Sequence, residues 1–297
     1  MRGRGPVKTD EGRADVAGEM LDHAIVIKAA SAIEPVPPTV SWLAAAMGRE
    51  DYSLREIEQV IAYDPVLTGR ILRIANSAAL GTGAPIGNVR AAIMKIGAGR
   101  VLSYALSGPL GKQLQRPVAG YGLGQGVLWR HLVASALAVE LLDGATRVRP
   151  PAEAFTAALL HDLGQVVMAQ FLDPKLMHLI EIAKEEGLSS REAEVAILGV
   201  HQGEVGALVA QEWRLPDPIV RAIAYAGTTE NGADPLYDFV HLGHVFAGRI
   251  GEYPGMPACE LEIPPEVAER VGLRDEAVEP LLEKIEERLG EVLRLYG

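Results

Sequence analysis

The sequence predicts an all-α fold, a helical bundle in two lobes. Three observations support this prediction. Apolar residues recur at helical spacing almost everywhere, and the alternation typical of strands never persists. Signals that start helices recur along the chain, and one glycine-rich segment divides it near the middle. Hydrophobic residues make up 48% of the 297 residues, which is enough to bury a sizeable core.

The helix starts in the first half carry capping signals. Ser53 is followed three residues later by Glu56, as in a capping box, and Asp64 precedes a proline at a first helical position. The same box recurs in the second half at Ser189 and Glu192. In the first half the spacing predicts helices over 20–32, 39–47, 53–62, 65–77, 88–97 and 99–114.

Residues 117–126 contain four glycines and a proline, and we expect a flexible loop or hinge there. We place the boundary between a subdomain at 19–116 and another at 127–250 at this segment. A disordered arm at 1–18 precedes them, and a helical extension at 264–297 follows. The second half is predicted to hold helices over 127–142, 151–171, 174–186, 190–199, 203–213, 217–226 and 236–250.

After a stretch rich in Pro and Glu at 252–265, a charged helix is predicted over 275–295. Its apolar stripe, from Val278 to Leu293, either packs back on the domain or mediates self-association.

The charge is unevenly distributed. The net charge of −11 disfavours nonspecific binding to nucleic acid or membranes, and no interleaving of aromatic and basic residues supports nucleic-acid binding. Residues 65–118, however, contain no acid and seven Lys or Arg residues. This segment either docks a negatively charged partner or pairs with the acidic half of the same chain. Its candidate partner-binding residues are Arg70, Arg73, Asn76 and Arg100, and the three arginines could also contact the phosphates of a nucleotide.

Several features predict a cytoplasmic location. The single cysteine, Cys259, excludes an internal disulfide and suits a reducing compartment. Basic residues near the start are not followed by the apolar region of a signal peptide, and no apolar run is long enough to span a bilayer. We therefore expect no membrane partner.

Polar residues that could carry chemistry fall on helix faces that the spacing predicts to be packed. Asp162 lies one turn from Ala158 and in line with Val166, so its charge requires a cation, a histidine, a helix N-terminus or a metal. His131 and His161 lie over small residues, which leave room for an imidazole or allow close helix contact.

Two further histidines are candidates. His244 falls on the apolar face of the helix predicted over 236–250. His201 precedes a helix that contains two glycines, and it either caps that helix or reaches a central pocket.

Several ordered segments resemble the HDOD family, a divergent branch of the HD phosphohydrolase superfamily. They include Asp64 to Ser77 (DPVLTGRILRIANS), Leu128 to His131, Ala158 to Gly164 around the His161-Asp162 pair, and His201 to Gly206. The resemblance covers most of residues 30–250. It implies an all-helical, HD-like fold, with 19–250 forming one HDOD domain and 127–250 its HD-like part. It also implies a role in bacterial signalling, in a family that is not generally known as catalytic.

Related HD enzymes hold one or two divalent metals with a first His, the His-Asp pair and a distal Asp. His131, His161 and Asp162 match the first three positions, but His244 stands where the distal Asp is expected. Relatives often carry paired histidines where this chain reads Ala224 to Gly227. A bridged pair of hard metals needs several oxygen ligands, and this set offers one carboxylate.

Three interpretations remain at this point. In the first, the chain is a noncatalytic regulatory module that binds a signalling protein, has no resident cofactor, and holds Asp162 by hydrogen bonds from histidines. In the second, His131, His161, Asp162 and His244 hold one divalent transition metal, and the chain is a metal-dependent phosphohydrolase or phosphodiesterase with Asp162 as its candidate catalytic residue. The third is the sensing of a nucleotide or nucleic acid through the basic segment at 65–118, which the charge of the whole chain opposes.

Overall fold

The computed structural model describes residues 23–33, 38–47, 52–62, 65–76, 86–106, 114–151, 153–213, 215–226, 234–253 and 256–296. These residues form helices and connecting turns, and within them the only β pairing is an isolated bridge between Val118 and Leu123. The predicted all-α fold is therefore confirmed. None of the helices described is long and apolar enough to cross a membrane.

The first lobe contains α2 (Pro38–Met47), α3 (Leu54–Ala62), α4 (Pro65–Ala75), α5 (Val89–Ile96) and α6 (Ala98–Leu106). Helices α3 and α4 pack on α5, and α2 packs on α6. Ile57, Ile61 and Ile71 are fully buried at these contacts. The predicted helices are found here with shifted ends, and the part of the predicted 99–114 helix over 107–113 lies outside the described residues.

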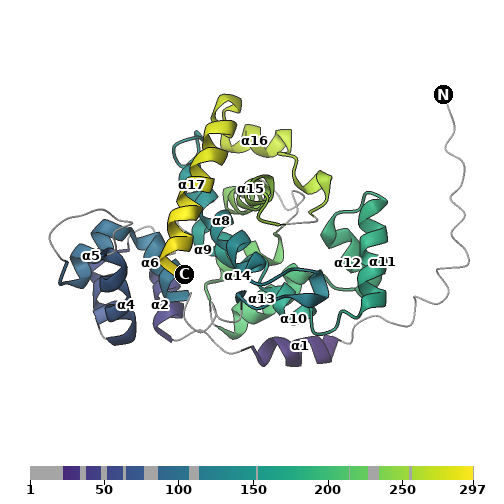
Figure 1. Ribbon diagram of the computed structural model, residues 1–297, viewed down its shortest axis with the longest axis horizontal. Helices are drawn as coiled ribbons and strands as arrows, with labels where there is room; N and C mark the ends of the chain where they lie inside the picture. Colours follow the sequence, from purple (N-terminus) through teal and green to yellow (C-terminus); the bar gives the residue numbers. More distant parts are fainter. Residues whose placement is uncertain are drawn as a thin grey trace, which may run out of the picture.

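The second lobe is built around α8 (Val127–Leu142) and α15 (Pro235–Arg249), with α9 (Ala154–Leu160), α13 (Gln202–Glu212) and α14 (Asp217–Ala224) beside them (Figure 1). Helices α8 and α15 approach each other closely, because Gly243 has no side chain. A Cβ at Gly243 would lie 2.8 Å from the carbonyl oxygen of Ser135. Since His244 follows Gly243 and His131 lies one turn before Ser135, this approach brings the two histidines together.

The prediction of a single helix over 151–171 is wrong. The helix α9 ends at Leu160, a turn spans His161 to Leu163, and α10 (Gly164–Met168) follows. The turn is tightened by bonds between residues three apart, such as the one from the Leu163 N–H to the Leu160 carbonyl (3.0 Å). Gly164 then contacts the start of α13 so closely that a Cβ would lie 1.9 Å from the carbonyl oxygen of Gln202.

The flexible loop expected at 117–126 is instead a packed turn. It contains a short 3₁₀ helix, η2 (Ala119–Tyr121), and Val118 and Leu123 are buried. A Cβ at Gly120 would lie 2.7 Å from the Cα of Ala169, so this turn fits tightly against the chain that follows α10.

Further helices cover the second lobe. Helices α11 (Pro174–Glu185) and α12 (Ser190–Leu198) pack together on one side, and α1 (His23–Ser31) packs on α13 and α10 (Figure 1). A helix that the sequence analysis missed, α16 (Pro265–Val271), precedes α17 (Val278–Tyr296).

The apolar stripe of α17 packs within the chain, against α8. Its Leu281, Ile285 and Leu289 side chains are at most 4% exposed. The two lobes meet where α6 packs on α9, with Gly99 against the ring of Phe155. The subdomain boundaries that we expect at 19–116, 127–250 and 264–297 remain predictions.

Candidate functional site

Three histidines from three different elements converge in the second lobe. His131 comes from α8, His161 from the turn between α9 and α10, and His244 from α15. The Nε2 atom of His131 lies 3.3 Å from Nε2 of His161 and 3.1 Å from Nδ1 of His244. The last two atoms are 2.9 Å apart.

Asp162 completes the cluster. Its Oδ2 atom lies 3.4 Å from Nε2 of His131 and 3.3 Å from Nε2 of His161. The four ligand atoms all lie within 4.8 Å of one another, and the Asp162 side chain is only 3% exposed. The structure thus brings together the four residues that the sequence analysis grouped as metal candidates.

Five of the six distances among the four atoms match those expected around a single tetrahedral ion. Metal–nitrogen bonds of about 2.0–2.1 Å place the ligands of a tetrahedral site about 3.3 Å from one another. Five of the six distances between these atoms run from 2.9 to 3.4 Å, and the sixth, between Asp162 and His244, lies within 4.8 Å. Three imidazoles and one carboxylate are a donor set that suits zinc or a neighbouring transition metal better than magnesium.

The outer ring nitrogens of two of the histidines face oxygen atoms outside the cluster. Nδ1 of His161 lies 2.7 Å from the carbonyl oxygen of Ala158, so it donates its proton outward and leaves a lone pair on the inward Nε2. Nε2 of His244 lies 3.7 Å from Oε2 of Glu260, which is longer than a hydrogen bond, so this contact is an electrostatic one.

The electrostatics of the cluster keep the acid charged. Burial raises the pKa of Asp162, but His161, His131 and His244 outweigh burial and hold that pKa well below its usual range. Burial lowers the pKa of His131 to about 4. Burial also lowers the pKa of His244, but Glu260 and Asp162 overcome this and the net pKa is raised. Without a metal ion, the cluster would therefore consist of the Asp162 carboxylate beside one protonated imidazole.

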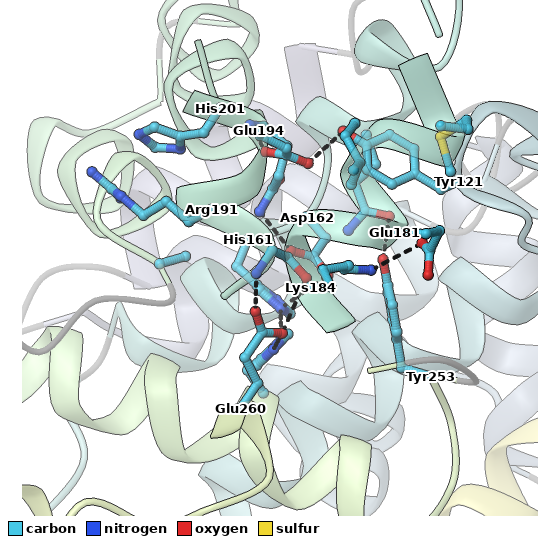
Figure 2. A pocket seen from close by; sticks show the side chains of 17 residues that line it. Tyr121, His161, Asp162, Glu181, Lys184, Arg191, Glu194, His201, Tyr253 and Glu260 are labelled. Carbon is cyan, nitrogen blue, oxygen red and sulfur yellow. Dashed lines mark hydrogen bonds and ion pairs between the residues drawn. The ribbon is translucent and has the colours of Figure 1, made fainter. Parts of the chain in front are cut away.

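A polar cleft opens onto the cluster. His161, Asp162 and His244 form part of its wall, and its cavity volume is about 70 Å³ (Figure 2). That volume holds about five water molecules or one small ionic group. Several residues that line the cleft were not predicted from the sequence, namely Tyr121, Gln165, Lys184, Arg191, Glu194, Tyr253 and Glu260.

A chain of hydrogen bonds connects the cluster to the packed turn. Nε2 of Gln202 donates to Oδ1 of Asp162 (2.8 Å), and the Gln202 backbone N–H donates to Oε2 of Glu194 (2.7 Å). The Tyr121 hydroxyl donates to the other oxygen of Glu194 (2.7 Å) (Figure 2). Burial raises the pKa of Glu194 to about 7. Helical spacing contained a signal for Glu194, because this residue lies one turn before the buried Leu198.

Other cleft residues come from the stretch that we expected to be a Pro- and Glu-rich connection. Tyr253 stacks edge-on against His131, with ring centroids 5.0 Å apart, and its hydroxyl donates to Oε1 of Gln165 (3.2 Å). Glu260, from η3 (Ala258–Glu260), accepts a hydrogen bond from the backbone of Ser190. Irregular segments have no periodicity, so no sequence signal predicted these contacts.

His201 has both of the roles considered for it. It caps α13, since its Nδ1 accepts a hydrogen bond from the backbone N–H of Gly203 (3.1 Å), and it also lines the cleft. It is not part of the four-residue cluster.

A family model for the HDOD domain matches residues 33–228, well over half of the chain. The chain belongs to the HDOD domain family. The cluster and the cleft lie mainly in this HDOD domain, but His244, Tyr253 and Glu260 follow the matched residues.

Comparisons with individual proteins agree with this family. An uncharacterized protein of Treponema pallidum is 25% identical over 65% of this chain, and the match covers 37% of that protein. An HDOD domain protein of unknown function from Geobacter sulfurreducens has a TM-score of 0.60 and 22% identity, over 90% of this chain and 99% of that one.

Two other solved structures share the fold. A protein provisionally named a signal transduction protein, from Marinobacter aquaeolei, gives a TM-score of 0.72 and 19% identity, over 95% of this chain and 63% of that one. A protein provisionally named a phosphohydrolase, from Shewanella amazonensis, gives 0.61 and 21%, over 92% and 97%. At these identities the likeness shows the fold alone.

The candidate partner-binding residues lie in the other lobe of the HDOD domain. Asn76 uses its side chain within the protein, since it donates to the carbonyl oxygens of Leu72 and Ile86 and accepts from the Ile86 N–H. The Arg100 side chain is 11% exposed and faces Glu140 of α8 at 3.8 Å. Arg73 is exposed and Arg70 is half-buried. Their role in binding a partner or a nucleotide remains a prediction.

Proposed function

We propose that this HDOD protein is a regulatory module of signal transduction that acts by binding a partner protein. We further propose that its HD-like centre holds one divalent transition metal and does not hydrolyse phosphate esters. The observation that carries this proposal is the convergence of three imidazole nitrogens and one carboxylate oxygen within 4.8 Å of one another.

A closed set of four ligands favours a structural role over a catalytic one. Catalytic zinc sites use three protein ligands and keep a fourth position open for water. His131, His161, Asp162 and His244 would fill all four positions. The ion, when bound, would cross-link α8, the turn between α9 and α10, and α15, and Gln202 would hold the carboxylate of Asp162 in place.

The donor set also argues against the two-metal chemistry of related hydrolases. Asp162 is the one carboxylate in this cluster, whereas two metals that activate water for attack on phosphate need several bridging oxygen ligands. The name of the Marinobacter aquaeolei structure agrees with a signalling role.

Phosphohydrolase or phosphodiesterase activity is the second candidate function. The cleft favours it, because the cleft reaches His161, Asp162 and His244 and would admit a ligand to the metal centre. The name of one Shewanella amazonensis structure agrees with this alternative. It requires one protein ligand to leave the ion so that a water molecule can bind.

Two measurements on the purified chain separate these functions. Elemental analysis should find about one transition metal per chain, and bis(p-nitrophenyl) phosphate should show no metal-dependent hydrolysis. Asp162→Ala should lose the metal, whereas His178→Ala, which removes an exposed histidine of α11, should retain it. Metal-dependent turnover that disappears in Asp162→Ala would establish the enzyme instead, and a wild-type chain that never retains metal would refute the metal site.

A further inference from the structure

The acidic side chains that line the cleft are all partnered. Oε1 of Glu181 lies 3.4 Å from Nζ of Lys184, and Glu260 accepts hydrogen bonds from the first turn of α12. Asp162 and Glu194 accept the hydrogen bonds described above. Outside the four-residue cluster, the described residues of the cleft therefore include no unpaired acid that would call for a cationic ligand.

Unlike the acids of the cleft, the guanidinium of Arg191 has no partner of opposite charge among the described residues. Within the described part of the chain, its guanidinium has one hydrogen-bond partner, the carbonyl oxygen of Ala224, to which Nη1 donates (3.2 Å). No carboxylate of these residues lies within ion-pair distance of it, and Arg191 is one of the residues that line the cleft. Arginine presents several donors in a planar fork that matches the geometry of a carboxylate or a phosphate.

A buried donor without an acceptor lies beside this arginine. Nδ1 of His201 accepts the Gly203 N–H, so the ring proton of the neutral imidazole sits on Nε2. His201 is 2% exposed, and its Nε2 has no hydrogen-bond partner among the described residues. The nearest acid, Glu204, is half exposed and lies 3.6 Å away, beyond hydrogen-bond distance.

The carbonyl group of Ala224 lies near both residues. Arg191 donates to the Ala224 oxygen, and a Cβ at Gly203 would lie 3.0 Å from that same oxygen and 3.0 Å from the His201 ring. Figure 2 shows both side chains at the same end of the cleft. Arg191 also contributes to the lowered pKa of His201, after burial, which is consistent with their proximity.

We propose that Arg191 and His201 form a binding site for an oxyanion group, a phosphate or a carboxylate, of a small molecule that enters the cleft. The cleft has a cavity volume of about 70 Å³, which would admit an oxyanion group. This site goes beyond the proposed function, since it gives the regulatory module a ligand. It does not depend on the metal, because neither residue belongs to the four-ligand cluster.

Calorimetric titration of the full chain with inorganic phosphate, and separately with acetate, tests the site. Both titrations are run at constant ionic strength, on metal-loaded and on chelator-treated protein. We expect one of the two anions to bind in both preparations, and the anion that binds identifies the group. Arg191→Gln should weaken that binding at least tenfold. His201→Asn, which keeps a capping oxygen for the Gly203 N–H but removes the Nε2 donor, should weaken it threefold or more.

The matched control is Arg221→Gln, which removes an exposed arginine of the neighbouring helix α14 and should leave affinity within twofold of the wild type. Circular dichroism verifies that each variant folds, and Arg191→Lys provides a second test of the guanidinium, with intermediate affinity expected. The proposal fails if neither anion binds or if Arg191→Gln binds as the wild type does. It also fails if binding requires the metal and survives Arg191→Gln, because the anion would then be a ligand of the ion.

Discussion

The Cα of Gly243 packs so closely on the carbonyl of Ser135 that a single added carbon would lie 2.8 Å from its oxygen. This contact sets the distance between α8 and α15, and thereby the distance between His131 and His244. The same glycine thus determines both the packing of two central helices and the geometry of the histidine cluster.

Gly243→Ala should therefore destabilise the protein and weaken metal retention together. We expect a loss of about 1–3 kcal/mol in the free energy of unfolding, because the helices must separate to admit the methyl group. Urea denaturation measures the loss, and elemental analysis measures the metal. Gly69→Ala is the control, since no atom lies within 4 Å of its added carbon and it sits inside α4. That variant should be as stable as the wild type or up to about 1 kcal/mol more stable.

Removing the metal should lower the stability of the wild-type chain. An ion that binds only the folded protein adds about 2.7 kcal/mol when its free concentration is 100 times the dissociation constant. Thermal unfolding before and after chelator treatment should show this difference, and zinc should restore it. Asp162→Ala should unfold at the same temperature with or without chelator. Equal wild-type curves in the two conditions would contradict a resident ion.

The raised pKa of Glu194 should make the free energy of unfolding depend on pH in a specific way. Its pKa is about 7 in the folded protein and has an ordinary value of 4.5. The folded state then binds more protons than the unfolded state between these values, so this residue makes stability fall as pH rises from 4.5 to 7. Buried histidines with lowered pKa change stability in the opposite direction. The contribution of Glu194 is therefore isolated by comparing the wild type with Glu194→Gln at each pH. Over this interval the variant should gain about 1–3 kcal/mol relative to the wild type.

Glu192→Gln on the same helix is the control for this experiment. Hydrogen bonds from Ser189 lower the pKa of Glu192, so its contribution is lost only as pH falls below 4.5. Relative to the wild type, this variant should show a constant difference in stability from pH 5 to 7. A similar constant difference in Glu194→Gln would mean that Glu194 is charged throughout this range.

Asn76 should matter for stability, although the sequence analysis assigned it to partner binding. Its side chain makes three hydrogen bonds that join the end of α4 to Ile86, so Asn76→Ala should cost about 1 kcal/mol in a denaturation experiment. Arg73→Ala, which removes an exposed side chain of α4, should change stability by less than about 0.5 kcal/mol. Equal free energies of unfolding for the two variants would contradict a structural role of Asn76.

The sequence was sufficient to predict the helical fold and to select the four residues of the cluster. Burial of Asp162 followed from its position on an apolar face, and a buried acid requires hydrogen-bonding or oppositely charged partners. The break after Leu160 was not predictable in this way, because apolar spacing continues through it and the close contact of Gly164 with α13 that accompanies it is a tertiary one. Tyr253 and Glu260 reach the site through tertiary packing of an irregular segment, which local spacing does not encode.

Helix α1 ends before the start of the HDOD match at residue 33, yet its Val26 and Ala30 are at most 2% exposed beneath the second lobe. A shortened protein that begins at the family boundary would strip this cover from α13, the helix whose first turn carries His201 and Gln202. Recombinant versions of this domain should therefore retain residues 23–32. Without them, the apolar face of α13 that α1 covers would be exposed to solvent while the cleft is assayed.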